Sequence, residues 1–227
     1  LSGAYQHAIR RGIVTSSPVD RLLPEERPKA DQREMRCLSR EEIGRLLKAT
    51  GDKGGSKWNA DLWKSLFTTL VFTGLRPNEA LSLTWDDVDH SRGVLMIRKS
   101  KTAAGVREVM LMDTVRKQLL ESRLSQPPGT RFVFASGTGR PPSVRECRRA
   151  LRVAEERAGL PRYTLYELRH TFASILIAQR ETLPFICDQM GHANPSVTLK
   201  VYAHLFGRDD AIEAARGRLN DAFGGMG

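Results

Sequence analysis

Apolar side chains recur every three or four positions along most of this chain. The pattern begins after Ser39, which stands at capping-box distance from Glu42. The same period predicts helices near residues 63–71, 113–124, 143–158, 164–176, 184–190, 195–204 and 209–223. Three glycines at or just beyond the ends of such segments predict where the helices stop: Gly74, Gly159 and Gly191.

Two short runs rich in branched and apolar residues predict strands instead. They cover residues 94–98 and 106–112 and flank the polar turn 99–105, which is typical of a hairpin. Residues 132–134 are expected to add a third strand, and Asp113 to cap the helix that follows the hairpin. The predicted fold class is mainly α with a small antiparallel β-sheet (α+β).

The first part of the chain differs from the rest in composition. Pro18, Pro24 and Pro28 fall in the polar stretch 16–32, which is typical of a linker. Residues 2–11 have the pattern of the end of a helix. We expect residues 1–32 to be the end of a truncated N-terminal domain plus a linker, and residues 33–227 to be the main domain with a C-terminal helix.

The charge balance points to a polyanionic partner. Lys and Arg total 36 against 26 for Asp and Glu, a formal net charge of +10. A balance this basic favours nucleic acid, and a basic enzyme with an unrelated substrate stays as the alternative.

The remaining composition narrows the setting. No apolar run approaches the roughly 20 residues that a membrane span needs, and no secretory signal is visible. The three cysteines are far apart in the sequence, which fits free thiols in a reducing cytosol and makes a zinc site unexpected. We expect a cytoplasmic protein with no metal.

Four arginines share one face of the helix predicted at 143–158. Their spacing of i, i+3, i+4 and i+7 stacks them in a stripe: Arg145, Arg148, Arg149 and Arg152. Close like charges on a helix repel by roughly 0.2–0.5 kcal/mol per pair. A DNA backbone or major groove opposite explains the stripe better than a merely solvated face, which is the alternative.

Four short motifs carry side chains suited to phosphodiester chemistry. In chain order they are Thr-Gly-Leu-Arg-Pro at 73–77, Ser-Lys-Thr at 100–102, Tyr-Glu-Leu-Arg-His-Thr at 166–171, and Met-Gly-His at 190–192 followed by Tyr202. A tyrosine that attacks a phosphodiester creates a five-coordinate phosphorane with extra negative charge. Arginine offers a planar pair of donors that stays charged, and lysine can protonate a leaving oxygen. No metal is required if side chains supply the positive charge.

Together and in this order, the motifs resemble those of the tyrosine recombinase (phage integrase) family, across nearly all of residues 33–204. The resemblance implies that the main domain is a catalytic domain and the truncated segment a core-binding domain. It implies that Arg76 and Arg169 hold the scissile phosphate. It also implies that Tyr202 is the nucleophile and forms a 3′-phosphotyrosyl link, with no cofactor.

Three further residues take roles from the same resemblance. Lys101 is similar to the hairpin lysine that protonates the leaving 5′ oxygen, with Lys99 as a nearby competitor. His192 resembles the histidine that hydrogen-bonds the phosphate. Glu79, three residues after Arg76, matches an acidic position that braces the site.

One position departs from the family pattern. Tyr166 stands where the family usually has a histidine, three residues before Arg169, and is expected to point at the phosphate from the same helix face. A neutral phenol is a poor base near pH 7, so the proton acceptor for Tyr202 is in doubt. His170 is expected to be structural, because about 100° of helix rotation turns it off that face.

The leading hypothesis is a site-specific recombinase that integrates or excises a mobile element. The alternatives are a DNA-binding regulator with this fold and reduced or lost catalysis, and a topoisomerase-like enzyme that nicks and reseals. The resemblance implies a double-stranded DNA site and a homotetramer on DNA, while the isolated fragment is expected to be monomeric. The helix at 209–223 is expected either to dock on a neighbouring protomer or to pack on its own domain.

Overall fold

The computed structural model describes residues 2–23, 26, 36–50, 57–98 and 105–202. The chain divides into two compact units, Leu1–Met35 and Arg36–Gly227. In the first unit, helix α1 (Ser2–Arg10) precedes the short 3-10 helix η1 (Pro18–Arg21). The identity of this segment, with its expected end at residue 32, stays a prediction. Lys101 and the helix expected at 209–223 lie outside the described residues.

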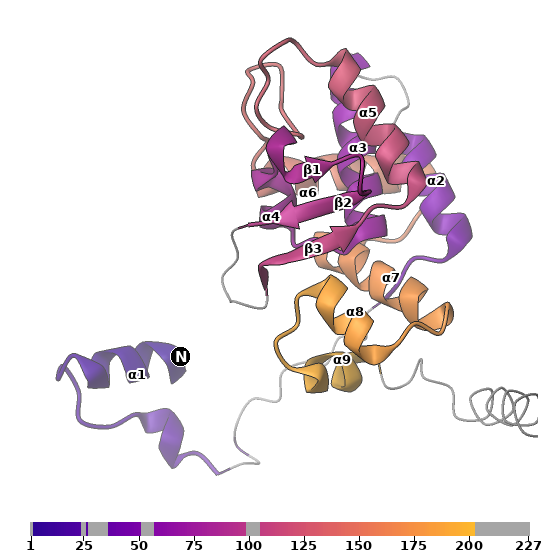
Figure 1. Cartoon of the computed structure of the whole chain (residues 1–227). Helices are drawn as coiled ribbons and strands as arrows, with labels where there is room; N and C mark the ends of the chain where they lie inside the picture. Colours follow the sequence, from indigo (N-terminus) through magenta and orange to yellow (C-terminus); the bar gives the residue numbers. More distant parts are fainter. Residues whose placement is uncertain (1, 24–25, 27–35, 51–56, 99–104, 203–227) are drawn as a thin grey trace, which may run out of the picture. The chain divides into compact units, whose positions relative to one another are not determined.

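The second unit is mainly helical (Figure 1). Its helices are α2 (Arg40–Thr50), α3 (Lys57–Thr73), α4 (Pro77–Ser82), the 3-10 helix η2 (Trp85–Asp87), α5 (Asp113–Ser125), α6 (Val144–Ala158), α7 (Leu165–Ala178), α8 (Leu183–Met190) and α9 (Pro195–Tyr202). Side chains accept a backbone N–H at several helix starts, among them Ser39, Ser143, Thr164 and Thr182. None of the described helices is long and apolar enough to cross a membrane.

The strands form an antiparallel sheet in the order β1-β2-β3 (Figure 1). They are β1 (Val88–Asp89), β2 (Val94–Ile97) and β3 (Arg107–Met110). In the register of β2 and β3, Val94 pairs with Met110 and Ile97 with Arg107. The predicted fold class, mainly α with a small antiparallel sheet, is confirmed.

Two local predictions are wrong. The third strand is β1, whereas residues 132–134 contribute only an isolated bridge between Phe132 and Thr84. Their apolar character reflects burial, since Val133 and Phe134 are each 1% exposed in the core. The residue at the N-cap of α5 is Met112, and Asp113 is already helical; its carboxylate pairs with a side chain one turn on and stays exposed.

Two buried clusters hold the second unit together. The larger one includes Phe67 of α3 and draws on α2, α5, α6 and the sheet as well. The smaller one joins α7, α8 and α9; it includes Phe172, Ile186, Met190 and Tyr202. A large buried apolar side chain stabilises the fold by about 1.5–3 kcal/mol. Apolar packing therefore determines where α9 places Tyr202.

Gly74 lies where the end of α3 meets α7. Its φ is +61°, and a Cβ there would come within 2.5 Å of the Phe172 ring. Both the left-handed backbone and the close approach require glycine. The contact brings the segment with Arg76 against the helix that carries Arg169.

Candidate active site

Arg76 stands at the N-cap of α4, directly before Pro77. Its backbone N–H and its Nη1 both donate to the Glu79 carboxylate, at 3.0 and 2.7 Å. Its Nη2 donates to the carbonyl of Gly191 at 2.9 Å, across 115 residues of sequence. The Arg76 side chain keeps 31% of its surface exposed, so a ligand can reach it.

Glu79 is a buried carboxylate between two arginines. Arg107 of β3, whose side chain is 2% exposed, donates to it from Nη2 at 3.2 Å and from Nη1 at 3.4 Å. Burial raises the pKa of Glu79, but the hydrogen bonds and positive charges of Arg107 and Arg76 outweigh it, so the pKa lies below its ordinary value. Glu79 is therefore ionised at neutral pH and orients both arginines.

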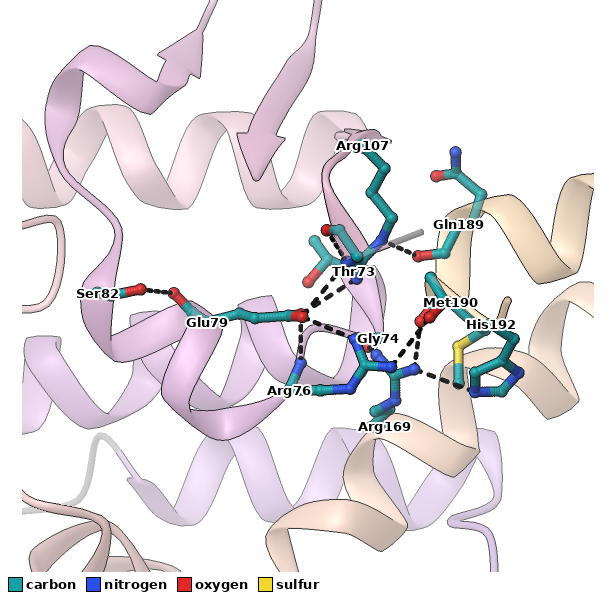
Figure 2. Close-up of polar contacts among 12 residues, drawn as sticks. Thr73, Gly74, Arg76, Glu79, Ser82, Arg107, Arg169, Gln189, Met190 and His192 are labelled. Atoms are coloured by element: carbon teal, nitrogen blue, oxygen red, sulfur yellow. Dashed lines mark hydrogen bonds and ion pairs between the residues drawn. The ribbon is translucent and has the colours of Figure 1, made fainter. Parts of the chain in front are cut away.

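Arg107 also ties strand β3 to the end of α8. Its Nε donates to the Gln189 carbonyl at 2.9 Å, and the Gln189 side chain accepts from the Met110 N–H at 2.9 Å. A Cβ at Gly191, whose φ is +61°, would lie 2.8 Å from the Arg107 guanidinium. The turn after α8 thus packs directly on this arginine (Figure 2).

Arg169 reaches the same place from α7. It is 3% exposed, and it donates from Nη1 to the Gly74 carbonyl and from Nη2 to the Met190 carbonyl. Met190 ends α8, so its carbonyl is one that the helix itself leaves unpaired. Burial, followed by the charges of Arg76 and Arg107, lowers the pKa of Arg169 to about 9, which still leaves it charged at neutral pH.

His192 follows the glycine turn and bridges Arg169 and Thr198. Its Nε2 lies 3.2 Å from Arg169 Nη2, and its Nδ1 lies 2.8 Å from the Thr198 hydroxyl. A guanidinium only donates, so Nε2 accepts and the neutral ring carries its proton on Nδ1. Burial, followed by the charges of Arg169 and Arg76, lowers the pKa of His192 to about 4. The ring is therefore neutral at pH 7.

Tyr202, the last residue of α9, is 2% exposed. Its hydroxyl forms a hydrogen bond with Nδ1 of His170, and the two rings lie 5.7 Å apart between centroids. Burial, followed by the neighbouring Cys37, raises the pKa of the Tyr202 phenol. Burial, followed by the charge of Arg169, lowers the pKa of His170. Both groups are therefore neutral at pH 7.

His170, expected to be structural, lies beside the Tyr202 hydroxyl, and its role stays a prediction. Helix rotation does turn it off the face that carries Tyr166 and Arg169. Helix α9, however, packs with α7 in the smaller cluster and brings Tyr202 to His170. Arg169 and the residue that follows it, His170, therefore both border the site.

Other predicted residues are not drawn into this cluster. Tyr166 is 53% exposed, and its hydroxyl makes no hydrogen bond to any described residue. The stripe of α6 is exposed along its length; its members are Arg145, Arg148, Arg149 and Arg152. Lys101 belongs to a segment that the structure does not describe, so its position stays a prediction.

Three side chains complete the cluster without having been singled out in the sequence: Arg107, Gln189 and Thr198. Arg107 did carry a signal, because it shares the buried face of β3 with Val109 and a buried charge needs a partner. Gln189 and Thr198 carried no such signal, because only folding brings them close to their hydrogen-bond partners. No group of three or more His, Cys, Asp or Glu side chains placed to hold a metal ion occurs among the described residues.

Solved structures place the fold in a class. The Tn1549 transposon integrase in complex with transposon right-end DNA matches with a TM-score of 0.72 at 22% identity, over 96% of this chain and 76% of that one. The XerH site-specific recombinase bound to its difH substrate matches with a TM-score of 0.66 at 25% identity, over 85% and 58%. The fold is that of tyrosine recombinase catalytic domains.

Sequence comparison gives the family. Residues 36–208 match the phage integrase family, to which this chain belongs. The tyrosine recombinase XerC of Halalkalibacterium halodurans is 30% identical over 217 residues, covering 90% of this chain and 68% of the relative. Prophage integrase IntR of Escherichia coli K12 is 27% identical over 258 residues, covering 97% and 59%. The chain therefore spans less than two thirds of the length of IntR.

Proposed function

We propose that this chain carries the catalytic domain of a site-specific tyrosine recombinase, which cuts and rejoins DNA through a covalent 3′-phosphotyrosyl link when a mobile element integrates or is excised. One observation carries the proposal. Arg76, Arg169 and His192 come together at the ends of α3 and α8. Next to Arg169 on α7, His170 forms a hydrogen bond with Tyr202 of α9.

A DNA phosphate fits the donors of this cluster. Arg76 and Arg169 now donate to backbone carbonyls, which fixes the guanidinium planes before a ligand arrives. A phosphate oxygen is a charged acceptor, and such bonds are roughly twice as strong as neutral ones. Because Arg107 shares the single Glu79 carboxylate with Arg76, the cluster keeps an excess of positive charge. That excess stabilises the phosphorane.

The covalent step uses Tyr202. Its oxygen bonds to the scissile phosphorus while the bond from phosphorus to the 5′ oxygen breaks, and Lys101 supplies the proton to that leaving oxygen. The phosphotyrosyl link keeps the bond energy, so a 5′ hydroxyl reverses the step without a nucleotide cofactor. Tyr202 has to leave its buried position to reach DNA, since only 2% of it is exposed.

The proposed partner is a double-stranded DNA site. The net charge of +10 and the exposed stripe of α6 favour it, and the matched Tn1549 integrase was solved in complex with transposon right-end DNA. Family membership supports the further proposal of a homotetramer on DNA, with residues 209–223 docking on a neighbouring protomer or on their own domain. The fragment alone is then monomeric, and its setting is the bacterial cytoplasm.

A nicked duplex that traps the intermediate tests the proposal. The DNA is selected by binding to the full chain from a random-sequence library, and a nick beside the scissile phosphate lets the 5′ fragment diffuse away. We expect a covalent protein–DNA adduct on a denaturing gel, absent for Tyr202→Phe. The matched control is Tyr163→Phe, which removes a hydroxyl bonded to Glu42 at 2.9 Å and should still form the adduct.

Two other outcomes would change the conclusion. Tight binding to the selected site without any adduct would favour the regulator with lost catalysis. An adduct that reseals without exchanging strands between two labelled duplexes would favour the topoisomerase-like enzyme.

A further inference from the structure

The hydroxyl that the proposed function makes the nucleophile already has a basic partner. Tyr202 Oη contacts His170 Nδ1, and each side chain comes from a different helix, α9 and α7. Tyr166, at the position where the family usually has histidine, is exposed and makes no such contact. The side chain in contact with the Tyr202 hydroxyl is therefore His170 and not Tyr166.

The direction of this hydrogen bond follows from burial. If His170 donated its Nδ1 proton, the phenolic proton of Tyr202 would be left without an acceptor among the described residues, in a site where Tyr202 is 2% exposed. An unsatisfied buried donor costs about 1–3 kcal/mol. With the imidazole neutral, the favoured arrangement has Tyr202 donating to Nδ1, which accepts.

We propose that His170 is the catalytic base of the cleavage step, taking the phenolic proton of Tyr202 on Nδ1. As the tyrosine oxygen bonds to phosphorus, its proton passes to Nδ1 and the bond to the 5′ oxygen breaks. In rejoining, the 5′ hydroxyl gives its proton back to Lys101 as its oxygen attacks phosphorus, and the tyrosine oxygen leaves and takes its proton back from Nδ1. This assignment rests on the proposed function.

The position of His170 suits both stages of the reaction. It directly follows Arg169, so the base and a phosphate ligand come from adjacent positions of one rigid helix. The base therefore lies next to the arginine toward which the phenol has to move. Glu167, on the same helix, favours the imidazolium that forms, whereas Arg169 opposes it.

Replacing His170 by asparagine separates proton transfer from packing. The Asn amide oxygen can accept the same hydrogen bond but does not take up a proton near neutral pH. We expect His170→Asn to slow adduct formation on the nicked duplex by on the order of 10²-fold or more, with unchanged DNA affinity and Tm. His90→Asn, a matched change between β1 and β2 and outside every motif, should react at the wild-type rate.

The pH profile gives a second readout. Arg169, Glu167, His192 and Cys37 are the charged or titratable groups near His170 and Tyr202. The base must be neutral, so the wild-type rate should fall as pH drops through the pKa of His170, below 6.5. His170→Asn should lack this limb. A rate for His170→Asn equal to or above the wild-type rate would overturn the proposal. The hydrogen bond would then only hold Tyr202 in its buried position.

A measurement without DNA separates this inference from the proposed function. Nitrogen NMR of the free full chain should find Nδ1 of His170 unprotonated, with a signal that changes in Tyr202→Phe. A protonated Nδ1 would overturn the assignment even if the wild type forms adduct. Absence of adduct from the wild type, with the NMR result as expected, would count against the proposed function instead.

Discussion

Arginines occupy two opposite environments in this domain. In the buried cluster, the guanidinium groups of Arg76, Arg107 and Arg169 donate to helix-end carbonyls, and the first two share Glu79. On α6, four arginines line an exposed face at helical spacing. The same side chain is fixed by the fold in one region and left to solvent in the other.

The difference separates positioning from attraction. A buried, hydrogen-bonded guanidinium has one orientation, so it can recognise a single phosphate geometry. An exposed arginine keeps its rotamer freedom and acts through a field that salt screens within about 10 Å at 0.1 M. Under the proposed function, the first region is suited to the scissile phosphate, and the second to DNA of any sequence. Three changes test the contrast, in order of their effect on stability.

The largest effect is expected from Arg107→Met. It leaves Glu79 buried with one arginine fewer and frees the Gln189 carbonyl, and losing one partner of a buried ion pair costs about 3–5 kcal/mol. The free energy of unfolding from urea titration measures it. Arg148→Met, the same substitution on the exposed stripe, should stay within about 0.5 kcal/mol of wild type. If both variants lose the same free energy of unfolding, the buried and exposed arginines do not differ in their contribution to stability.

An intermediate effect should appear as pH dependence through Glu79. Its pKa in the folded chain lies below the ordinary 4.5, so the ionised carboxylate stabilises the fold above pH 4.5. That stabilisation is lost as pH falls through the folded pKa. In urea titrations from pH 7 to 3, Glu79→Gln should be less stable at pH 7 and should lose less stability on acidification.

Glu156→Gln is the control for the pH series. Its ion pair with Arg162 lies at the surface, with both side chains more than half exposed, and such pairs contribute little. Its unfolding curve should follow that of the wild type at every pH. If the Glu79→Gln curve also follows the wild type, the ion pairs of Glu79 with its two arginines do not contribute to the pH dependence of stability.

The smallest effect on stability is expected from replacing the whole stripe of α6 by alanine. Removing like charges should stabilise the helix slightly, by roughly 0.2–0.5 kcal/mol per close pair. DNA binding should weaken, and the slope of log affinity against log salt should flatten by up to about 0.9 per arginine. The four-lysine variant keeps the charge and should keep the slope. If the slope is unchanged in the alanine variant, the stripe of α6 is a solvated helix face that does not contact DNA.

Local signals predicted most of the helices and their ends. Ser143 and Gly159 bound α6 as expected, because capping depends on neighbours in sequence. The strand expected at 132–134 failed because burial and strand pairing both favour apolar residues. Asp113 failed as a cap because capping residues also occur in the first helical turn, where their charge is favourable.

The site was only partly predictable. Motif order placed Arg76, Arg169 and His192 in one family pattern, and the fold brings them together. The pairing of His170 with Tyr202 spans 32 residues and depends on how α9 packs against α7. Periodicity describes one helix at a time, so it carries no information on which neighbour covers a given face. The roles of all these residues stay predictions until the variants are measured.

Arg76 and Arg169 each contact a residue far away in the sequence, and this determines when during translation the cluster forms. Arg169 bonds a carbonyl 95 residues upstream, and Arg76 one 115 residues downstream. A polypeptide still on the ribosome has made Arg76 long before Tyr202 is synthesised. These contacts therefore form only after translation has passed α8, and under the proposed function a product that ends before α9 would lack the nucleophile.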